Sequence, residues 1–430
     1  MDKIKIIGGK PLFGKIYISG AKNTALPIIC ASLLTDGPVT IKNIPFLSDI
    51  KSLNNLLLQL GTQIDVKQEL LNGHNTQAIT YHTPQPTSFI APYDYVRKMR
   101  ASYYVLGPLL TKYGHVELSL PGGCAIGARP MDIHLTSLEQ MGAQIEIKNG
   151  YVIANSNGRL HGAHIAFHAA SVGATCNILM AAVLADGTTV IENAAKEPEI
   201  ADLIDMLNKM GAHIEGANTS TLTIYGVEKL HGVTHQIIND RIEAGSYAIA
   251  AAITKGRLEL INADAEHLKS PLDILRKMGV KIDITPNSII VDAQNTILHG
   301  EDVYTDYYPG FPTDLQAQFM ALMCVSEGAA LITENIWENR FMHVPELMRM
   351  GANINVHGHA SAIVRGVEKL SAAPVMSTDL RASFSLILAG LVAEGETIVN
   401  RVYHLDRGYE TLEEKFKAVG ADIERIKEND

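Results

Sequence analysis

One pattern recurs six times along the 430 residues, and it limits the folds that this chain can adopt. Its first part is an apolar segment of helical length, followed by a glycine-containing turn and a run rich in β-branched residues. The six segments span 24–44, 100–120, 174–194, 244–264, 315–335 and 382–402. The turn glycines are Gly37, Gly114, Gly187, Gly256, Gly328 and Gly395. Because these helices are apolar nearly all round, we expect them to be buried.

The second part of the pattern is an amphipathic segment that ends in glycine and continues as an alternating strand. These segments span 53–66, 137–147, 203–216, 271–284, 344–356 and 411–425. Their glycines are Gly61, Gly142, Gly211, Gly279, Gly351 and Gly420, at intervals of 81, 69, 68, 72 and 69 residues. A glycine just past a helix adopts the left-handed conformation at little cost. The charged faces of these helices predict an outer position.

The length of the repeat indicates the fold class. A period near 70 residues is too long for a common solenoid, and it suits a unit of two helices and several strands. Six such units divide naturally into two domains of three. We therefore predict an α/β fold of inside-out barrel type, in which buried helices are surrounded by outer sheets.

Charge and composition exclude several classes of protein. The chain has 36 Lys and Arg against 46 Asp and Glu, a net charge of −10, which argues against a nucleic-acid binder or a polybasic membrane anchor. No apolar run is long enough to span a bilayer, and the first residues do not resemble a secretory leader. The four cysteines have neither metal-ligand nor disulfide-framework spacing. These features predict a reduced, cytoplasmic protein without a metal or other cofactor.

The starts of the buried helices carry cations. Lys22, Arg97, Arg100, Arg241 and Arg381 stand where a positive charge opposes the helix dipole, which indicates an anionic ligand because helix N-termini also bind anions. The alternative interpretation of these charged and polar segments is that they only cap the buried helices.

Two of these starts contain a pattern typical of a capping box, Asp240 with Glu243 and Thr313 with Gln316. Polar residues at such starts can therefore serve the helix alone.

The segment 121–134, PGGCAIGARPMDIH, has three glycines in seven residues and contains Cys124. Nearby cations such as Arg129 lower the pKa of a thiol and favour the reactive thiolate. A loop cysteine without a role is an equally good interpretation on residue type alone. Cys30, Cys176 and Cys324 lie in apolar helices and are interpreted as small core residues.

Beyond these patterns, the sequence resembles the enolpyruvyltransferase family, in the branch that acts on UDP-N-acetylglucosamine. The similar motifs are SGAKNTALP, MRAS, PGGCAIGARP, SVGAT, EPEI, GFPTDLQAQ, ENRFMHVPEL, TDLRAS and HLDRGYE, in this order from Lys22 to Glu410. The resemblance implies transfer of enolpyruvate from phosphoenolpyruvate to the sugar 3′-hydroxyl, with release of phosphate, as the first committed step of peptidoglycan synthesis. It also implies two inside-out domains that close on a cleft, 22–238 and 1–21 with 239–430.

The resemblance assigns roles to individual residues. Cys124 is implied as the proton donor to C-3 or as a nucleophile, and Asp314 as the base for the 3′-hydroxyl. Lys22 and Asn23 are implied as further catalytic residues. The expected contacts of phosphoenolpyruvate are Lys22, Asn23, Arg129, Arg407 and Arg340. For Arg340, an ion pair with Glu338 or Glu346 is nearly as good an interpretation.

The resemblance further implies contacts with the UDP-sugar from Arg100, Arg129, Pro130, Met131, Asp132, Ile133, Ser171, Val172, Gly173, Asp314 and Ile336. It also suggests Arg97, Asp379 and Arg381 as residues for domain closure or phosphate binding. The chain departs from the family where Ala169-Ala170 replaces the usual basic or proline residue before SVGAT. His134 and His404 are interpreted as structural.

Two other functions remain open at this point. One is a 3-phosphoshikimate 1-carboxyvinyltransferase, which shares the fold, and the other is a silent paralogue that binds a UDP-sugar as a regulator. The loop cysteine argues against the first, and the joint presence of Lys22, Cys124, Asp314 and Arg407 argues against the second.

Overall fold

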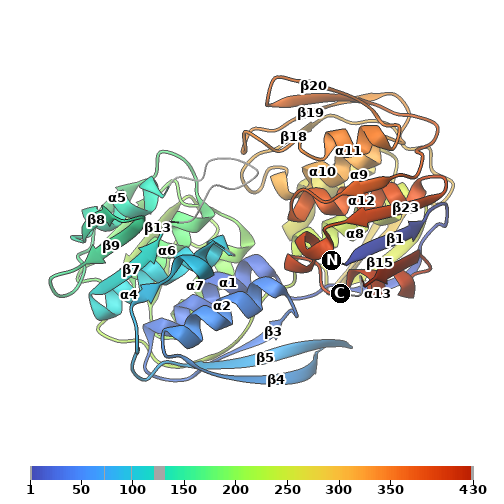
Figure 1. The fold of residues 1–430 in the computed structure, drawn as a ribbon. Coiled ribbons are helices and arrows are strands. Elements are labelled where there is room, and N and C mark those ends of the chain that lie inside the picture. The colour runs from blue at the N-terminus through green and yellow to red at the C-terminus, as the bar shows by residue number, and fades with distance from the viewer. Residues whose placement is uncertain (1, 72, 98, 121–130, 428–430) are drawn as a thin grey trace. The chain divides into compact units, whose positions relative to one another are not determined.

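The computed structural model describes residues 2–71, 73–97, 99–120 and 131–427. These residues form two compact units, which we call the inserted unit (the described residues of 20–120 and 131–238) and the terminal unit (the described residues of 2–19 and 239–427). In Figure 1 the inserted unit runs from blue to yellow-green, and the terminal unit combines dark blue with yellow to red. The predicted Cys124, Arg129 and Pro130 lie outside the described residues.

Helices of the inserted unit alternate between apolar and amphipathic, as the repeat predicts. They are α1 (Lys22–Ala31), η1 (Ser32–Leu34), α2 (Ser48–Gln59), α3 (Tyr93–Val96), η2 (Arg100–Val105), α4 (Leu106–Tyr113), α5 (Asp132–Gln140), α6 (Val172–Ala182) and α7 (Pro198–Lys209). The apolar helices α4 and α6 pack against each other, and α1 contacts α6 and α7. Their side chains form the core of this unit.

Strands of the inserted unit form three four-stranded sheets with the same topology. They are β3 (Val39–Ile44), β4 (Gln63–Leu71), β5 (His74–His82), β6 (Ile90–Ala91), β7 (His115–Ser119), β8 (Gln144–Lys148), β9 (Tyr151–Asn155), β10 (His164–Ala166), β11 (Thr188–Glu192), β12 (His213–Glu215), β13 (Thr221–Tyr225) and β14 (Thr234–Gln236). The orders are β14-β3-β5-β4, β6-β7-β9-β8 and β10-β11-β13-β12. In each sheet the first strand pairs in parallel with the second, and the others are antiparallel.

Helices of the terminal unit repeat the same alternation. They are α8 (Arg241–Ile253), η3 (Glu266–Leu268), α9 (Lys269–Lys277), η4 (Thr313–Leu315), α10 (Gln316–Met323), α11 (Val344–Arg349), α12 (Leu380–Val392), η5 (Val402–Arg407) and α13 (Leu412–Ala418). The apolar α8, α10 and α12 contact one another within this unit (Figure 1). In α8, every residue from Ile242 to Ile253 is buried. This burial confirms the inside-out arrangement.

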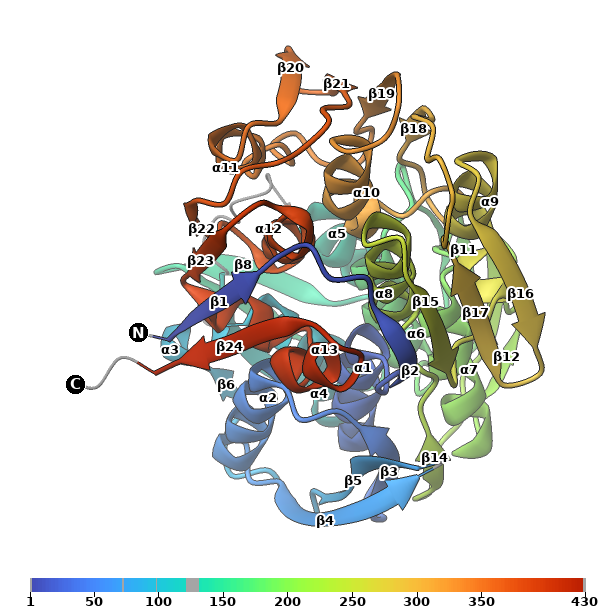
Figure 2. The same ribbon diagram turned by 90° about the vertical axis from the view of Figure 1, so that its right-hand side faces the viewer.

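Strands of the terminal unit also form three sheets, two of which include the N-terminal residues. They are β1 (Lys3–Ile7), β2 (Phe13–Tyr17), β15 (Arg257–Ile261), β16 (Lys281–Thr285), β17 (Ser288–Asp292), β18 (Val303–Tyr304), β19 (Ala329–Thr333), β20 (Asn353–His357), β21 (Ser361–Arg365), β22 (Pro374–Met376), β23 (Glu396–Asn400) and β24 (Asp422–Ile426). The orders are β16-β17-β15-β2, β18-β19-β21-β20 and β22-β23-β1-β24. Figure 2 shows β1 between β23 and β24.

The glycines that end the amphipathic helices adopt the predicted left-handed conformation. Their φ angles lie between 91° at Gly351 and 105° at Gly279 across the six repeats. A residue with a Cβ is strained at such angles. Each glycine therefore lets the chain reverse from helix to strand, which confirms the sequence interpretation of these positions.

The described helices include none that is both long and apolar enough to cross a membrane. Cys30, Cys176 and Cys324 are buried, as predicted for core residues. Burial raises the pKa of all three thiols, that of Cys324 to about 12. These three thiols are therefore protonated and unreactive at neutral pH.

Candidate active site

Asp314 of the terminal unit is held between two arginines from different segments. Its Oδ1 accepts a hydrogen bond of 2.8 Å from the guanidinium of Arg340, and its Oδ2 accepts one of 3.1 Å from Nε of Arg381. Both arginine side chains are about 95% buried, whereas 28% of the Asp314 side chain is exposed. The structure thus joins three residues that the resemblance assigned separately. Arg340 pairs with this aspartate, and Glu346, one of its two expected partners, pairs instead with Arg349.

The position of Arg381 is fixed by the start of α12. Asp379 is the N-cap residue, and its Oδ1 accepts hydrogen bonds from the backbone N–H groups of Arg381 and Ala382 at 2.9 and 3.0 Å. The Arg381 guanidinium also lies over the ring of Tyr409, 5.4 Å from its centroid. Burial opposes the charge of Arg381, but Tyr409, Asp314 and Asp240 favour it and raise its pKa. Arg381 is therefore a permanent cation beside Asp314.

The capping predictions for this unit were only partly right. Asp240 does cap α8, because its Oδ1 accepts from the N–H groups of Ile242 and Glu243. The side chain of Glu243 completes no box, since it accepts instead from the N–H of Ser19 and from Lys415.

At the start of α10, the predicted box of Thr313 with Gln316 is wrong. The Thr313 hydroxyl donates to Glu334 at 2.8 Å, and the N-cap residue of α10 is Leu315.

Lys22 lies at the first position of α1 in the inserted unit and is only 7% exposed. Its ammonium group forms an ion pair of 3.1 Å with Asp49, at the start of α2. Lys22 is therefore not a solvated surface lysine. Asn23, the next residue, is half-buried. Asp49 carried no signal in the sequence that distinguished it from an ordinary first-turn acid.

The predicted sugar-nucleotide residues of the inserted unit stand at helix starts. Met131 is the N-cap residue of α5, and Asp132 is the first residue of that helix. Ser171 caps α6 by accepting a hydrogen bond of 3.2 Å from the N–H of Ala174. The glycine of this motif is also explained by packing, since a Cβ at Gly173 would overlap the Tyr103 hydroxyl. The start of the 11-residue α6 thus offers N–H groups to an anion.

The remaining predicted cations have different surroundings. Arg97 is half exposed, pairs with Asp94 at 3.1 Å and lies over the ring of Tyr93. Arg100 begins η2, and Arg407 ends η5 in a half-buried position.

Two other predicted sugar-nucleotide residues have local contacts. The N–H of Ile336 donates to Glu334, and Asp132 lies 3.6 Å from His168.

Comparison with known proteins decides the family. A family model described as EPSP synthase (3-phosphoshikimate 1-carboxyvinyltransferase) matches residues 6–416. A UDP-N-acetylglucosamine 1-carboxyvinyltransferase from Granulibacter bethesdensis is 59% identical over 426 residues, 99% of this chain and 100% of the relative. One from Rhodospirillum centenum is 57% identical and covers 100% of both chains. The chain belongs to the UDP-N-acetylglucosamine 1-carboxyvinyltransferase family.

Solved structures share the fold of this 1-carboxyvinyltransferase family member. The enolpyruvyl transferase NikO from Streptomyces tendae superposes with a TM-score of 0.86 at 24% identity, over 100% of this chain and 99% of that one. An EPSP synthase from Acinetobacter baumannii gives a TM-score of 0.74 at 20% identity, over 99% and 100% of the two chains. At these identities the likeness shows the fold, and it confirms the predicted fold class.

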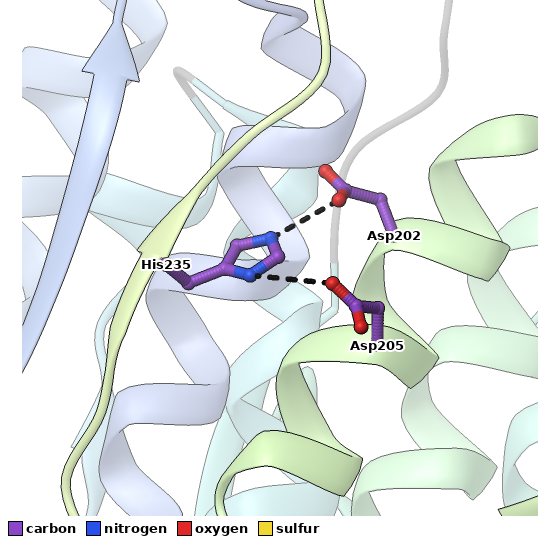
Figure 3. A group of neighbouring side chains, drawn as sticks. All are labelled: Asp202, Asp205 and His235. Atoms are coloured by element: carbon purple, nitrogen blue, oxygen red, sulfur yellow. Dashed lines mark hydrogen bonds and ion pairs between the residues drawn. The ribbon is translucent and has the colours of Figure 1, made fainter.

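One group in the described part of the chain has the residue types of a metal site, namely Asp202, Asp205 and His235 (Figure 3). Its carboxylates already have partners, because Asp202 accepts from Nε2 of His235 at 3.0 Å and from the N–H of Ile238 at 3.1 Å. Asp205 lies 3.8 Å from Nδ1 of His235 and 2.6 Å from Lys209. The group therefore links β14 to α7 as a structural contact.

His343 is a buried titratable group next to the Asp314 site. Its side chain is fully buried, and neither ring nitrogen has a hydrogen-bond partner. Burial lowers its pKa to about 4, with Arg340 adding to this effect and Asp379 opposing it. No pattern in the sequence distinguished His343 from an ordinary core residue.

We expect the neutral form of His343 to make folding pH-dependent. The pKa of His343 is about 6.5 in the unfolded chain and about 4 in the fold. Its contribution to the free energy of unfolding is therefore fully present above pH 6.5. As the pH falls toward 4, the free energy of unfolding decreases by about 3 kcal/mol from this group. Urea unfolding at pH 7.0 and 4.5 should show that His343→Leu loses less stability than the wild type between these values. Equal losses in the two proteins would contradict the prediction.

Proposed function

We propose that this protein transfers the enolpyruvyl group of phosphoenolpyruvate to the 3′-hydroxyl of UDP-N-acetylglucosamine and releases phosphate. The observation that carries the proposal is identity of 54–59% over essentially the whole chain to relatives that bear this activity in their name. The reaction is the first committed step of peptidoglycan synthesis and takes place in the cytoplasm. No nucleic acid or membrane takes part.

The substrates explain the cations. Phosphoenolpyruvate carries a phosphate and a carboxylate, and arginine binds such groups through two parallel N–H bonds. Lys22, Asn23, Arg129, Arg407 and Arg340 are proposed to hold it. The diphosphate of the UDP-sugar is proposed to bind at the start of α6, through Ser171 to Gly173, and at residues 130–133. Arg100, Asp314 and Ile336 complete the proposed sugar-nucleotide contacts.

The addition step needs an acid and a base together, because the cationic centre at C-2 is short-lived. Asp314 takes the proton of the 3′-hydroxyl as its oxygen bonds to C-2. Cys124 gives a proton to C-3, which completes the tetrahedral intermediate. Loss of a C-3 proton and cleavage of the bond between C-2 and the phosphate oxygen then regenerate the enol ether and release phosphate.

The two ion pairs of Asp314 couple substrate binding to this base. A carboxylate held by Arg340 and Arg381 is a weak proton acceptor, because both cations favour its ionised form. When one guanidinium turns to an anionic group of phosphoenolpyruvate, the carboxylate becomes more basic. Asp379 and Arg381 are thus proposed to act in phosphate binding or closure, and Arg97 remains a further closure candidate.

The decisive measurement is phosphate release from phosphoenolpyruvate with two acceptors in parallel. We expect release with UDP-N-acetylglucosamine and none with shikimate 3-phosphate. Release only with the shikimate substrate would assign the chain the activity by which its family model is described. Binding of UDP-N-acetylglucosamine without turnover under the same conditions would instead favour the silent regulator.

A further inference from the structure

Glu334 stands at a repeat position where four of the six repeats have a residue of left-handed conformation, and where Leu120 is the other exception. The residue six places after the turn glycine is Asn43, Asn193 and Asn262 in three repeats, and each has a φ between 56° and 66°. Arg401 takes the same left-handed conformation in a fourth repeat, with a φ of 58°. Glu334 stands at this position after β19 and does not have a positive φ. Its side chain therefore has a different task from that of the asparagines.

The carboxylate of Glu334 accepts four hydrogen bonds and is 3% exposed. Its Oε1 accepts from the hydroxyl of Thr305 at 2.9 Å and from the N–H groups of Ile336 and Trp337 at 2.9 and 3.2 Å. Its Oε2 accepts from the hydroxyl of Thr313 at 2.8 Å. An ionised carboxylate is the acceptor-only group that suits four donors.

These bonds reach both segments that supply the Asp314 ion pair. Thr313 directly precedes Asp314 in η4, and the turn at Ile336 and Trp337 leads within three residues to Arg340. The ion pair between Asp314 and Arg340, at 2.8 Å, then joins the two segments directly. One buried carboxylate thus fixes the backbone on both sides of this pair.

We propose that Glu334 is a positioning residue for the reaction, which sets the place of Asp314 through Thr313 and that of Arg340 through the 336–337 turn. This inference rests on the proposed function. Glu334 contacts no reacting atom, so its effect on turnover passes through the two residues that it places. A shift of about 1 Å in a catalytic group can cost about a hundredfold in rate.

A double-mutant cycle tests the inference. We expect Thr313→Val to lower kcat about fivefold with little change in KM for phosphoenolpyruvate, because only the bond next to Asp314 is lost. Glu334→Ala should lower kcat about fiftyfold and also raise this KM, because Arg340 moves as well. The double variant should match Glu334→Ala within about twofold, since the Thr313 bond is already absent. If the reduction of kcat in the double variant equalled the product of the reductions in the two single variants, the proposal would be overturned.

Two further variants separate positioning from simple stability. Asn262→Ala changes the same repeat position within the same unit, and we expect it to lower Tm without changing kcat. Glu334→Gln should keep kcat within about threefold of the wild type, because the amide oxygen replaces Oε1 and the Thr313 hydroxyl can accept from the amide nitrogen. Glu334→Ala and Asn262→Ala with equal changes in both Tm and kcat would reduce Glu334 to a stabilising residue.

Hydrogen exchange gives a readout that does not depend on turnover. Glu334→Ala should speed amide exchange at residues 313–318 and 336–340 together, and Asn262→Ala should not. Unchanged exchange in both segments would contradict the inference even in an active enzyme. A wild-type protein without phosphate release would instead contradict the proposed function, while the exchange result would still decide whether Glu334 fixes the two segments.

Discussion

Replacement of Cys124 by serine is expected to lower kcat for phosphate release by a hundredfold to ten-thousandfold while both substrates still bind. A serine hydroxyl is a far weaker acid than a thiol, so it cannot supply the proton to C-3 at neutral pH. Loss of a positioned general acid typically costs a factor of about 10² to 10⁴. The assay is steady-state phosphate release, combined with calorimetric titration of UDP-N-acetylglucosamine into the variant.

The other cysteines provide the control for this prediction. Cys324→Ala should retain kcat, because that thiol is buried and its pKa is raised to about 12. Fosfomycin, an epoxide mimic of phosphoenolpyruvate, should alkylate Cys124 and leave Cys30, Cys176 and Cys324 unlabelled in peptide mapping. Full turnover in Cys124→Ser, or label on the buried thiols, would remove Cys124 from the mechanism.

Replacement of Asp314 by asparagine should also reduce kcat by about 10² to 10⁴, because the amide cannot accept the 3′-hydroxyl proton. It should in addition destabilise the terminal unit by roughly 2 kcal/mol, since the buried Arg340 and Arg381 lose their shared counter-ion. Turnover and urea unfolding of the same preparation measure both effects.

Asp283→Asn is the matched control, because this exposed carboxylate lies on β16 and pairs only loosely with Lys281, at 3.7 Å. It should change neither kcat nor stability by more than a few tenths of a kcal/mol. If Asp314→Asn kept its turnover, Asp314 would be excluded as the base. If it lost turnover without loss of stability, the base would remain and the ion pairs would be energetically unimportant.

The repeated features of the fold could be predicted because each one has a local physical cause. Glycine after an amphipathic helix is favoured wherever the chain must take a positive φ, and Gly61 and its five equivalents do so. Helices that are apolar all round can only be buried, as α8 and α12 are. The three core cysteines follow from the same argument.

The contacts of the site could not be predicted, because they depend on which distant segments meet. Thr313 and Gln316 have the spacing of a capping box, but the Thr313 hydroxyl has a stronger acceptor in Glu334, 21 residues away. Likewise, the sequence favoured nearby glutamates for Arg340, whereas the fold brings Asp314 to it from 26 residues away.

A signal for Glu334 was nevertheless present in the sequence. When the six repeats are aligned on their turn glycines, the residue six places later is asparagine in three repeats and Leu120, Glu334 and Arg401 in the other three. In a repeated fold, a departure from the internal consensus indicates a residue whose task differs from that of its equivalents. Among the three residues that depart from asparagine, Glu334 is the one carboxylate, so comparison of the repeats with one another could have drawn attention to it.

The pairing of β1 and β2 with strands of the last repeats affects the order in which the chain can fold on the ribosome. Residues 3–17 are made first, yet their partners β15, β23 and β24 are made only after residue 256. All sheets of the inserted unit, by contrast, have their partners within residues 39–236. Strands β1 and β2 therefore have no strand partners while the inserted unit is synthesised, and that unit can already fold during this time.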